Sequence, residues 1–502
     1  MSTENFENSM VERPWVTTKL QQLLFLCTMI ALITKVIEKT RFLHALRKIP
    51  YPTALPIIGN AYQLNCTPEE FFQKMIQWSK EFGNIFLVWV ASRPFIFLYT
   101  VEAVKPLLKS TTHTNKSLEY EYLKPWLGIG LVTNNGLKWY VRRKLLTPSF
   151  HSGLNDAYLK IIKKQSAILI SCLHKEVGKC FDVVPYAKRA ALDMICETSM
   201  GYYVNAQTNL NNEYVKAVDR IASIVQMRFT NVWVSWNPIF KLTKAGKEHD
   251  RSLNIIHSLV NKVIAERKRQ RNGNSNRPSK KRQALLDLLL DISQNGTVLT
   301  DKDIREEVNT FMYAGHDTTA TSISWALYVL GRHPEYQEKI LNEYDEIIGT
   351  DEITTENINK LIWLDACIKE QWRLYPVVPL IARQIYEPIE ILGIQVPRGS
   401  TVLINSYLLH RDARFFPEPH VYRPERFLPN SAKIPPFAFI PFSAGSRNCI
   451  GWKFATMFIK VAVVSVLKSF NIEAIEKEDD LRFKSELVLI NTNGIQLKLM
   501  PR

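Results

Sequence analysis

Apolar side chains recur three or four positions apart along most of this chain, and that period predicts a mainly α-helical protein. The helical pattern dominates residues 154–291. It is interrupted near residues 230–238 and by a basic stretch over residues 267–282, which we interpret as a solvated loop between helices. No repeat of 20–50 residues is visible, so solenoid and propeller architectures are not expected.

Two helices stand out for their start and stop signals. Thr300 and Asp303 resemble a capping box, and they predict the beginning of a long helix that continues to about residue 331. At a rise of 1.5 Å per residue such a helix would be about 45 Å long, enough to cross the whole body of the protein. A second helix is predicted over residues 355–375, where Pro376 stops it.

Strand patterns are short and few. Residues 84–100 contain two β-rich runs around a turn and predict a hairpin. Further β-rich segments occur at residues 389–396 and 401–404, before a proline-rich loop over residues 411–441. The predicted fold class is therefore mainly α with a small β portion.

The N-terminus contains an apolar run over residues 20–37, which barely reaches the roughly 17–25 residues that a membrane span requires. Acidic residues precede this run and several Lys and Arg residues follow it, so we predict a single uncleaved anchor with the rest of the chain on the cytosolic side. An interfacial amphipathic helix is the alternative. The predicted organisation is a tail with its anchor (1–37), a basic, proline-rich hinge (38–60) and one large domain (61–502).

The composition says more about which partners the protein can bind than about its fold. Among 502 residues, 46% are hydrophobic and 22% charged, which is ordinary for a globular protein. The net charge of +16 favours an acidic partner or an anionic membrane surface. Nucleic acid is not expected as a partner, because no zinc-finger spacing or RNA-binding aromatic motif is present. Seven scattered cysteines do not resemble a disulfide framework and fit a reducing compartment.

The most informative segment is Phe-x-x-Gly-x-Arg-x-Cys-x-Gly, which fixes Phe442, Gly445, Arg447, Cys449 and Gly451. A metal-bound thiolate needs nearby cations and backbone N–H donors. Glycines let the backbone approach a flat cofactor, an aromatic ring restricts water, and an arginine can contact an anionic group of the cofactor. A chance match in a chain of this length is on the order of one in ten thousand. The segment therefore predicts a cysteine-ligated metal cofactor.

Three further motifs are weaker when taken alone. In the long helix, Gly315 precedes Asp317 and Thr318, and these poor helix formers suggest a local groove with polar groups facing a ligand. Glu370 and Arg373 share a helix face and can form an ion pair. A third motif places Trp139 and Arg143 one helical turn apart, where both can donate hydrogen bonds to a carboxylate, although a basic surface helix is the simpler interpretation.

Together these motifs resemble the cytochrome P-450 family, in which a cysteine thiolate is the axial ligand of haem iron. The resemblance extends from the proline hinge to the C-terminus, and it is nearest to the microsomal fatty-acid ω-hydroxylase branch with its many insect members. Residues 122–131, 143–151 and 309–313 carry the likeness to this branch. It implies the cytochrome P-450 fold, a single large haem domain, and Cys449 as the ligand of the iron.

The resemblance also implies roles for the other residues. Thr318 would hydrogen-bond dioxygen bound at the iron, and Asp317 would help to deliver protons. Glu370 and Arg373 would pair with Arg426 and hold the loop that carries Cys449. The residues implied in cofactor binding are Trp139, Arg143, Arg383 and Arg447, as donors to the haem propionates, and Phe442, Gly445 and Gly451, in the cysteine loop.

One departure from that branch changes the expected cofactor chemistry. Many of its members have Glu at the position of Ala314, and that carboxylate can become esterified to a haem methyl group. Ala314 cannot form this bond. We therefore expect non-covalently bound haem b.

The implied activity is insertion of one atom of O₂ into an apolar small molecule, with electrons from an NADPH-dependent flavoprotein reductase. Cytochrome b5 is an additional candidate donor, and the implied location is the endoplasmic-reticulum membrane with the catalytic domain facing the cytosol. A haem-thiolate isomerase or dehydratase without a reductase, and a non-catalytic haem or lipid carrier, are the alternatives. Fatty acid, isoprenoid hormone and xenobiotic all remain open as substrates, and residues 118–131, 225–240 and 312–314 are expected to line the pocket.

Overall fold

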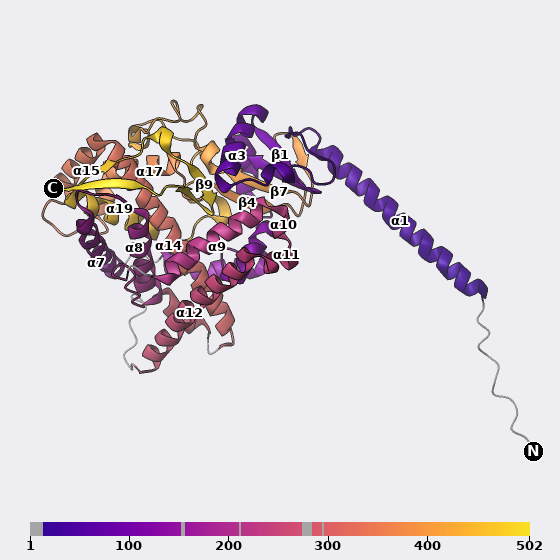
Figure 1. The fold of residues 1–502 in the computed structure, drawn as a ribbon, viewed down its shortest axis with the longest axis horizontal. Helices are drawn as coiled ribbons and strands as arrows, with labels where there is room; N and C mark the ends of the chain where they lie inside the picture. The colour runs from indigo at the N-terminus through magenta and orange to yellow at the C-terminus, as the bar shows by residue number, and fades with distance from the viewer. Residues whose placement is uncertain (1–13, 152–155, 210–211, 274–283, 294–295) are drawn as a thin grey trace, which may run out of the picture.

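The computed structural model describes residues 14–151, 156–209, 212–273, 284–293 and 296–502. Helices form most of the body, and small sheets lie mainly at one side of it (Figure 1). The helices are α1 (Pro14–Leu46), α2 (Ala61–Leu64), α3 (Pro68–Phe82), α4 (Val101–Lys109), α5 (Lys124–Leu127), α6 (Gly136–His151), α7 (Asp156–Leu173), α8 (Val184–Ile195), α9 (Glu213–Thr230), α10 (Val232–Ser235), α11 (Asn237–Leu242), α12 (Lys244–Gly273), α13 (Leu285–Ser293), α14 (Asp301–Arg332), α15 (Pro334–Ile347), α16 (Asn357–Lys360), α17 (Ile362–Leu374), α18 (Ser406–Leu409) and α19 (Trp452–Ser469). The predicted fold class, mainly α with a small β portion, is confirmed.

Eleven strands form the described sheets. The largest has the order β1–β2–β7–β4 and contains the predicted hairpin, β1 (Ile85–Val90) and β2 (Arg93–Leu98). The remaining strands are β3 (Cys180–Asp182), β4 (Leu380–Gln384), β5 (Ile389–Ile391), β6 (Ile394–Val396), β7 (Thr401–Asn405), β8 (Phe470–Ala474), β9 (Phe483–Glu486), β10 (Val488–Asn491) and β11 (Gln496–Pro501). They pair as β3–β11–β8, β9–β10 and β5–β6. The hairpin β1–β2 and the strands β5, β6 and β7 were predicted from the sequence, whereas β3, β4 and β8–β11 were not.

Helix α14 runs through the middle of the body (Figure 1). It begins at the predicted capping box, in which Thr300 and Asp303 exchange side-chain and backbone hydrogen bonds. Its N-terminal half packs in one hydrophobic cluster with α9 and α12, and its C-terminal half packs in a second cluster with α3 and α19. Residues 314–319 belong to neither cluster. The middle of α14 is therefore free to line a site.

Two predicted elements differ from the structure, and the predicted interruption near residues 230–238 is present, because α9 ends at Thr230. The basic stretch 267–282 does not begin as a loop, because α12 continues to Gly273. In this last part of α12, Arg267 and Arg271 form ion pairs with Asp287. The second half of that stretch lies outside the described residues. The region near residues 230–238 contains the short helices α10 and α11. The predicted helix 355–375 is divided at Leu361, where the Glu343 carboxylate accepts the first N–H groups of α17.

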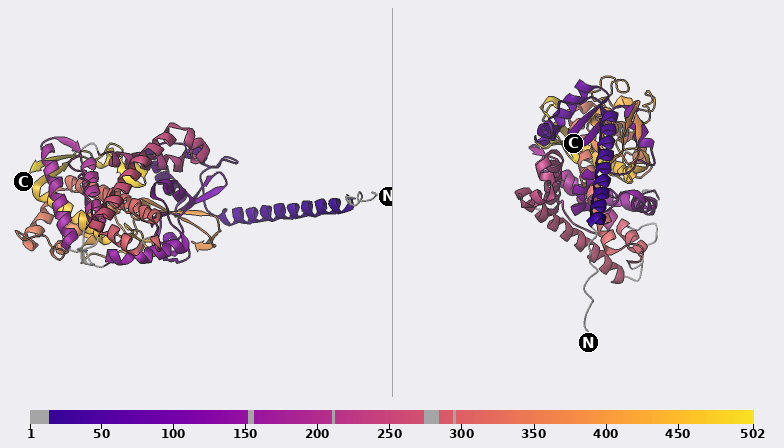
Figure 2. Two further views of the ribbon diagram at one scale, coloured as in Figure 1. Left: turned by 90° about the horizontal axis from the view of Figure 1, so that it is seen from below. Right: turned by 90° about the vertical axis from the view of Figure 1, so that its right-hand side faces the viewer.

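Helix α1 projects from the body as a single long rod (Figure 2). It extends beyond the predicted anchor to Leu46, so the first residues assigned to the hinge are helical and the prolines follow the helix. Across the described ranges, no helix has both the length and the apolarity needed to traverse a bilayer. The spanning anchor stays a prediction.

Candidate functional site

A cavity of about 330 Å³ lies against the middle of α14. In the stretch 306–330, all of which is described, only Ala314, Gly315 and Thr318 are not fully buried, and all three line this cavity. The loop before α19 and the strand β4 contribute the opposite walls. Segments distant in the sequence thus meet at residues 314–318 of α14, which lie between the parts of this helix that pack in the two hydrophobic clusters.

The loop that carries Cys449 is closed by its own backbone. The Cys449 N–H donates to the Phe442 carbonyl at 2.9 Å, and the Phe442 ring packs edge-on against Trp372 with centroids 4.9 Å apart. Gly445 has a φ of +71°, and a Cβ there would lie 2.0 Å from the Leu108 carbonyl oxygen. Gly445 does not line the cavity, and this contact with α4 is sufficient to require glycine there.

Cys449 lines the cavity directly, together with Phe442 and Gly451. Enclosure by protein raises the pKa of the Cys449 thiol, while the Gly451 N–H and the Arg143 guanidinium act in the opposite direction. Arg143 is fixed beside the cysteine because it donates to the Asn448 carbonyl and side-chain oxygens, both at 2.7 Å. A bound metal cation would favour the thiolate far more strongly than these two groups do.

Cationic side chains gather at another part of the cavity wall. Arg383 of β4, Arg447 and Lys116 all line the cavity, and in the described part of the chain none of them forms an ion pair with a carboxylate. Burial, together with the neighbouring Arg383, lowers the pKa of Arg447 to about 9. The pKa of Lys116 is lowered by burial and by both arginines. Three enclosed cations without a counter-charge need an anion.

The predicted propionate donors therefore meet around one place. Trp139 also lines the cavity, and the Arg447 guanidinium lies 3.8 Å from the centre of its ring. Arg447 is held by donating to the carbonyl oxygens of Thr114 and Asn134, at 2.8 and 2.6 Å. Lys116 was missed by sequence reasoning, because it lies in no motif and reaches the site only through the fold.

The helix α14 is not opened into a groove around Gly315, Asp317 and Thr318, as their residue types suggested. The helix continues without interruption through residues 314–319, and a Cβ at Gly315 would lie 2.5 Å from Ile195 Cδ1. Glycine there allows close packing of α8 against α14. The Thr318 hydroxyl lines the cavity and donates to the Ala314 carbonyl at 2.6 Å, which leaves its oxygen able to accept a further hydrogen bond.

Asp317 does not line the cavity. Its carboxylate lies 3.1 Å from Lys188 Nζ of α8, and Lys188 also contacts Asp219 of α9. Burial lowers the pKa of Lys188, but the two carboxylates outweigh that effect, so the pKa is raised and the ammonium persists. Asp317 is 2% exposed at its side chain and Asp219 is 48% exposed. A polar chain thus connects the back of the site to the surface.

The residues that line the cavity suit an anionic, metal-containing cofactor. In the residues that the structure describes, no group of three or more His, Cys, Asp or Glu could hold a bare metal ion. A single thiol beside a cavity therefore suits a metal whose other ligands come from an organic ring, and the uncompensated cations suit acidic groups on that ring. Haem has both features. Of the expected pocket segments, 118–131 and 312–314 contribute Leu131 and Ala314, whereas 225–240 contributes none of the lining residues.

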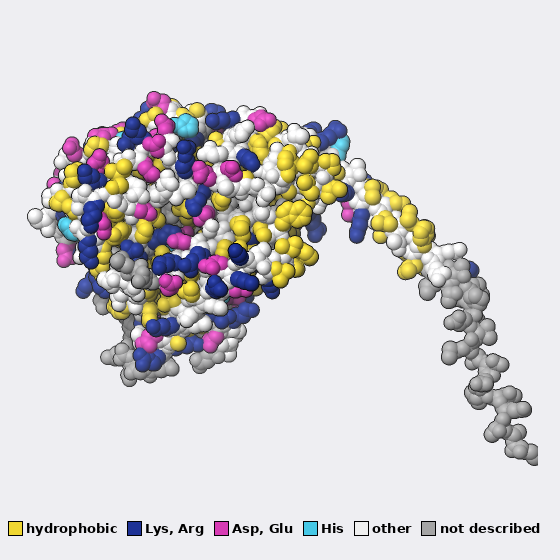
Figure 3. Space-filling view, in the orientation of Figure 1, with side chains coloured by type: hydrophobic (Ala, Val, Ile, Leu, Met, Phe, Trp, Pro, Cys, Tyr) yellow, Lys and Arg dark blue, Asp and Glu magenta, His cyan; other side chains and the backbone are white. Residues whose placement is uncertain are grey.

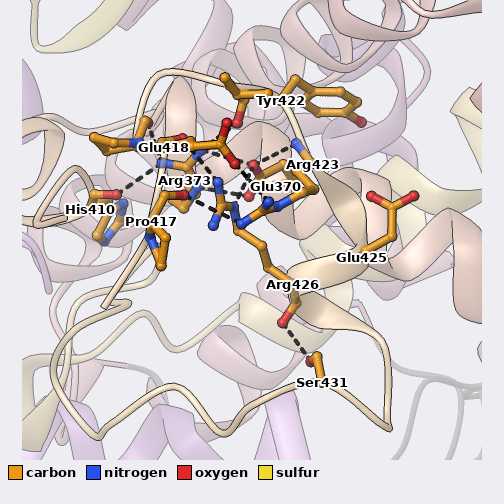
Figure 4. Close-up of polar contacts among 12 residues, drawn as sticks. Glu370, Arg373, His410, Pro417, Glu418, Tyr422, Arg423, Glu425, Arg426 and Ser431 are labelled. Atoms are coloured by element: carbon orange, nitrogen blue, oxygen red, sulfur yellow. Dashed lines mark hydrogen bonds and ion pairs between the residues drawn. The ribbon is translucent and has the colours of Figure 1, made fainter. Parts of the chain in front are cut away.

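A second polar group surrounds Glu370 and Arg373 (Figure 4). Glu370 and Arg373 are fully buried and form two hydrogen bonds, at 2.7 and 2.8 Å. Arg373 also donates to the carbonyls of His410, Pro419 and Val421, while Glu370 accepts the Arg423 N–H. The Arg426 guanidinium lies 3.4 Å from Glu370. The structure thus brings together the three residues that were predicted to pair.

Comparison with known proteins gives a consistent result. A family model described as cytochrome P450 matches residues 49–499. Cytochrome P450 4c3 of Drosophila melanogaster is 43% identical over 488 residues, which cover 93% of this chain and 91% of the relative. Cytochrome P450 4V2 of Homo sapiens is 41% identical over 490 residues, which cover 94% of this chain and 93% of the relative. Both insect and mammalian relatives thus align along nearly the whole chain.

The Glu370 carboxylate leads to a prediction about stability. Replacing Glu370 with Gln removes the charge that balances Arg373, and leaving a buried guanidinium without it should cost about 3–5 kcal/mol of unfolding free energy. Urea unfolding followed by circular dichroism measures this change. Glu356→Gln, in the exposed pair with Lys360, is the control and should have a much smaller effect. Equal destabilisation by the two substitutions would contradict the prediction.

Proposed function

This chain belongs to the cytochrome P450 family and is a P450 monooxygenase, and on that premise we propose the reaction and partners that its own residues favour. The proposed reaction converts an apolar substrate, O₂, NADPH and a proton into the hydroxylated product, NADP⁺ and water. The observation that supports it most directly is that Cys449, in the loop before α19, and Thr318, in α14, line the same cavity. Haem would be held by the Cys449 thiolate, which would donate the electron density that favours O–O cleavage.

The residues around the cavity have separable proposed roles. Cys449 holds the metal, and Lys116, Arg383 and Arg447 orient the cofactor through its acidic groups. Thr318 provides a hydroxyl at Oγ1 that can accept and pass on a proton beside the reacting oxygen. The polar chain from Asp219 through Lys188 to Asp317 supports a role for Asp317 in proton supply from the surface. Glu370, Arg373 and Arg426 are proposed to hold the protein behind the cysteine loop.

The proposed substrate class is an elongated aliphatic lipid, either a fatty acid or an isoprenoid. Apolar side chains form the walls of the cavity around Thr318, and a lipid chain would exclude water from them. The lining side chains of this kind include Val132, Phe311, Val377, Val378 and Ile381. Within the class, the position of attack depends on which carbon these walls place beside the reacting oxygen.

The proposed reductase contact is a basic face over the cysteine loop. Exposed Lys109 follows Leu108, which contacts Gly445, and exposed Lys144 follows Arg143, which binds Asn448. Lys453 is exposed two residues after Gly451. An acidic flavoprotein, or cytochrome b5 as a second donor, would meet complementary charge there, so raising the ionic strength should slow electron transfer to this face.

We also propose attachment to the endoplasmic-reticulum membrane through α1 and an adjoining apolar face. Hydrophobic side chains gather on the body near the base of α1 (Figure 3). Ile57, Trp233 and Leu242 are 91%, 70% and 83% exposed. The segment that contains Ile57 is joined to the one that contains Trp233, because the Asn231 side chain donates to the Asn65 side chain at 3.1 Å. Tryptophans at such a face suit the headgroup region. Vesicle flotation should weaken when Trp233 and Trp236 are replaced by Ser, and unchanged flotation would contradict the contribution of the apolar face.

Product analysis tests the proposed reaction. The purified protein with a microsomal flavoprotein reductase should hydroxylate a medium-chain fatty acid or an isoprenoid ester only when NADPH and O₂ are present. Cys449→Ala should abolish both the product and the red-shifted Soret band of the reduced carbon-monoxide complex, because the thiolate ligand is lost. Turnover without NADPH would favour an isomerase or dehydratase, and a haem complex without turnover would favour a carrier.

Thr318 gives a second prediction. Thr318→Ala should increase the NADPH consumed per product and release peroxide, because proton supply beside the reacting oxygen is lost. Thr318→Ser keeps the hydroxyl and should restore most of the coupling. Thr321→Ala is the matched control, since Thr321 bonds to the Asp317 carbonyl in the same helix but does not line the cavity. If Thr318→Ala and Thr321→Ala behave alike, the role of Thr318 is wrong.

Ala314 gives a third prediction, for non-covalent haem. Ala314 lines the cavity but has no group that can esterify the cofactor, so acidified organic solvent should extract nearly all haem from the polypeptide. Chromatography under denaturing conditions with detection at the Soret wavelength measures the bound fraction. Ala314→Glu restores the carboxylate found in many relatives of the branch and should retain part of the haem after turnover. Haem that stays with the wild-type chain would contradict the prediction.

A further inference from the structure

The segment between α5 and α6 lies directly against the N-terminal half of α14. A Cβ at Gly130 would be 2.1 Å from Thr310 Oγ1 and 2.8 Å from the Glu306 carbonyl oxygen. A Cβ at Gly128 would be 2.2 Å from Glu306 Cγ. Only glycine allows so close an approach of this backbone to the helix. The same segment continues into Leu131 and Val132, whose side chains line the cavity.

Glu307 of α14 fastens this segment from behind. Its side chain is 0% exposed, and its Oε2 accepts the Leu131 N–H at 3.1 Å. The other oxygen, Oε1, accepts from Arg142 Nη1 of α6 at 2.9 Å. Arg142 is 5% exposed and also forms an ion pair with Asp303 at the start of α14. One carboxylate therefore joins α14, the cavity-lining segment and α6.

Leu131 is also held from the side of the cofactor site. Its carbonyl accepts from Arg447 Nη1 at 3.5 Å, and the Asn134 carbonyl accepts from Arg447 Nη2 at 2.6 Å. The Leu131 residue is thus suspended between Glu307 through its N–H and Arg447 through its carbonyl. Glu307 itself does not line the cavity. Any effect of Glu307 on substrate must pass through Leu131 and Val132.

We propose that Glu307, with Arg142, is a positioning residue that sets which carbon of the substrate is oxidised, by fixing the wall formed by Leu131 and Val132. This inference rests on the proposed monooxygenase function. Regioselectivity depends on which carbon lies beside the reacting oxygen, and a displacement of about 1 Å is enough to change reaction rates strongly. A wall held by one buried carboxylate is displaced when the charge of that carboxylate is removed.

The clamp also has a pH dependence with a defined sign. Burial raises the pKa of Glu307 to about 7, against the opposing effects of Arg142 and the Leu131 N–H. The other charged groups facing this site are Asp303 and Glu306 of α14, Lys138 of α6, which contacts Asp303, and Arg447 on the far side of Leu131. Above pH 7 the ionised carboxylate holds Arg142 and Leu131. Below pH 7 protonation weakens both contacts and loosens the wall.

The test is Glu307→Gln in the full-length holoenzyme, with Glu306→Gln as the matched control. Gln keeps the volume of the side chain, and Arg142 retains Asp303 as a partner, so the variant should fold. Glu306 is buried next to Glu307 but bonds neither Leu131 nor Arg142. Both variants should keep the haem content and the carbon-monoxide spectrum of the wild type, because the Cys449 loop is unchanged.

The product ratio and its pH dependence distinguish a positioning role from a merely structural one, and hydrogen exchange tests the clamp itself. The ratio of hydroxylated positions on dodecanoic acid should change by about two-fold or more in Glu307→Gln. The wild-type ratio should change between pH 6 and pH 8, whereas the Glu307→Gln ratio should stay at the wild-type low-pH value across this range. Hydrogen exchange of peptides containing residues 128–134 should be faster in Glu307→Gln than in Glu306→Gln.

The outcomes that overturn the proposal are separate from those that overturn the proposed function. A wild-type product ratio and pH profile in Glu307→Gln would overturn positioning, even if exchange is faster. Equal exchange in the two variants would overturn the clamp itself. A wild-type protein that forms no hydroxylated product from any lipid would instead contradict the proposed function, and the exchange comparison would still decide whether Glu307 holds the segment.

Discussion

A buried ion pair between Glu370 and Arg373 organises the protein behind the cysteine loop. Such a pair is stable only when its remaining hydrogen-bonding groups are satisfied, and here the backbone between His410 and Arg423 satisfies them. The ordering continues from there, because His410 Nε2 accepts the Ile440 N–H at 2.9 Å, at the start of the loop that carries Cys449. Hydrogen bonds through His410 therefore connect this ion pair, which does not line the cavity, to the loop that carries the thiol.

The cavity itself is electrostatically incomplete as the chain alone builds it. Burial lowers the pKa values of Lys116, Arg383 and Arg447, and neighbouring arginines contribute to the lowering for Lys116 and Arg447. Carbonyl oxygens and an aromatic ring, which carry no negative charge, hold Arg447 in place. Near the thiol, Arg143 is bound by Asn448, which is neutral as well. Each of these contacts orients a cation without neutralising it. An anionic cofactor completes the site by removing this repulsion, so binding and local stability are coupled.

The parts of the site that could be predicted from sequence are those whose residues lie close together along the chain. The segment 442–451 and the helix start at Thr300 are local patterns, and both occur in the structure as short-range contacts. Lys116, Lys188 and Glu307 were not found, because each acquires its partners from helices or strands far away in the chain. The close contacts of Gly315 with Ile195 and of Gly445 with Leu108 could not be predicted either, because these neighbours are distant in sequence.

Helix α14 carries two charged residues, Glu307 and Asp317, that do not line the cavity. Arg142 holds Glu307 on the N-terminal side, and Lys188 holds Asp317 next to Thr318. Both carboxylates are fully enclosed and both partners come from other helices, so the rotation of α14 about its axis is fixed by charge as well as by packing. Ala314 and Gly315 lie between these two attachments and Thr318 directly follows the second, so the cavity-lining residues of α14 are placed by ion pairs that do not line the cavity themselves.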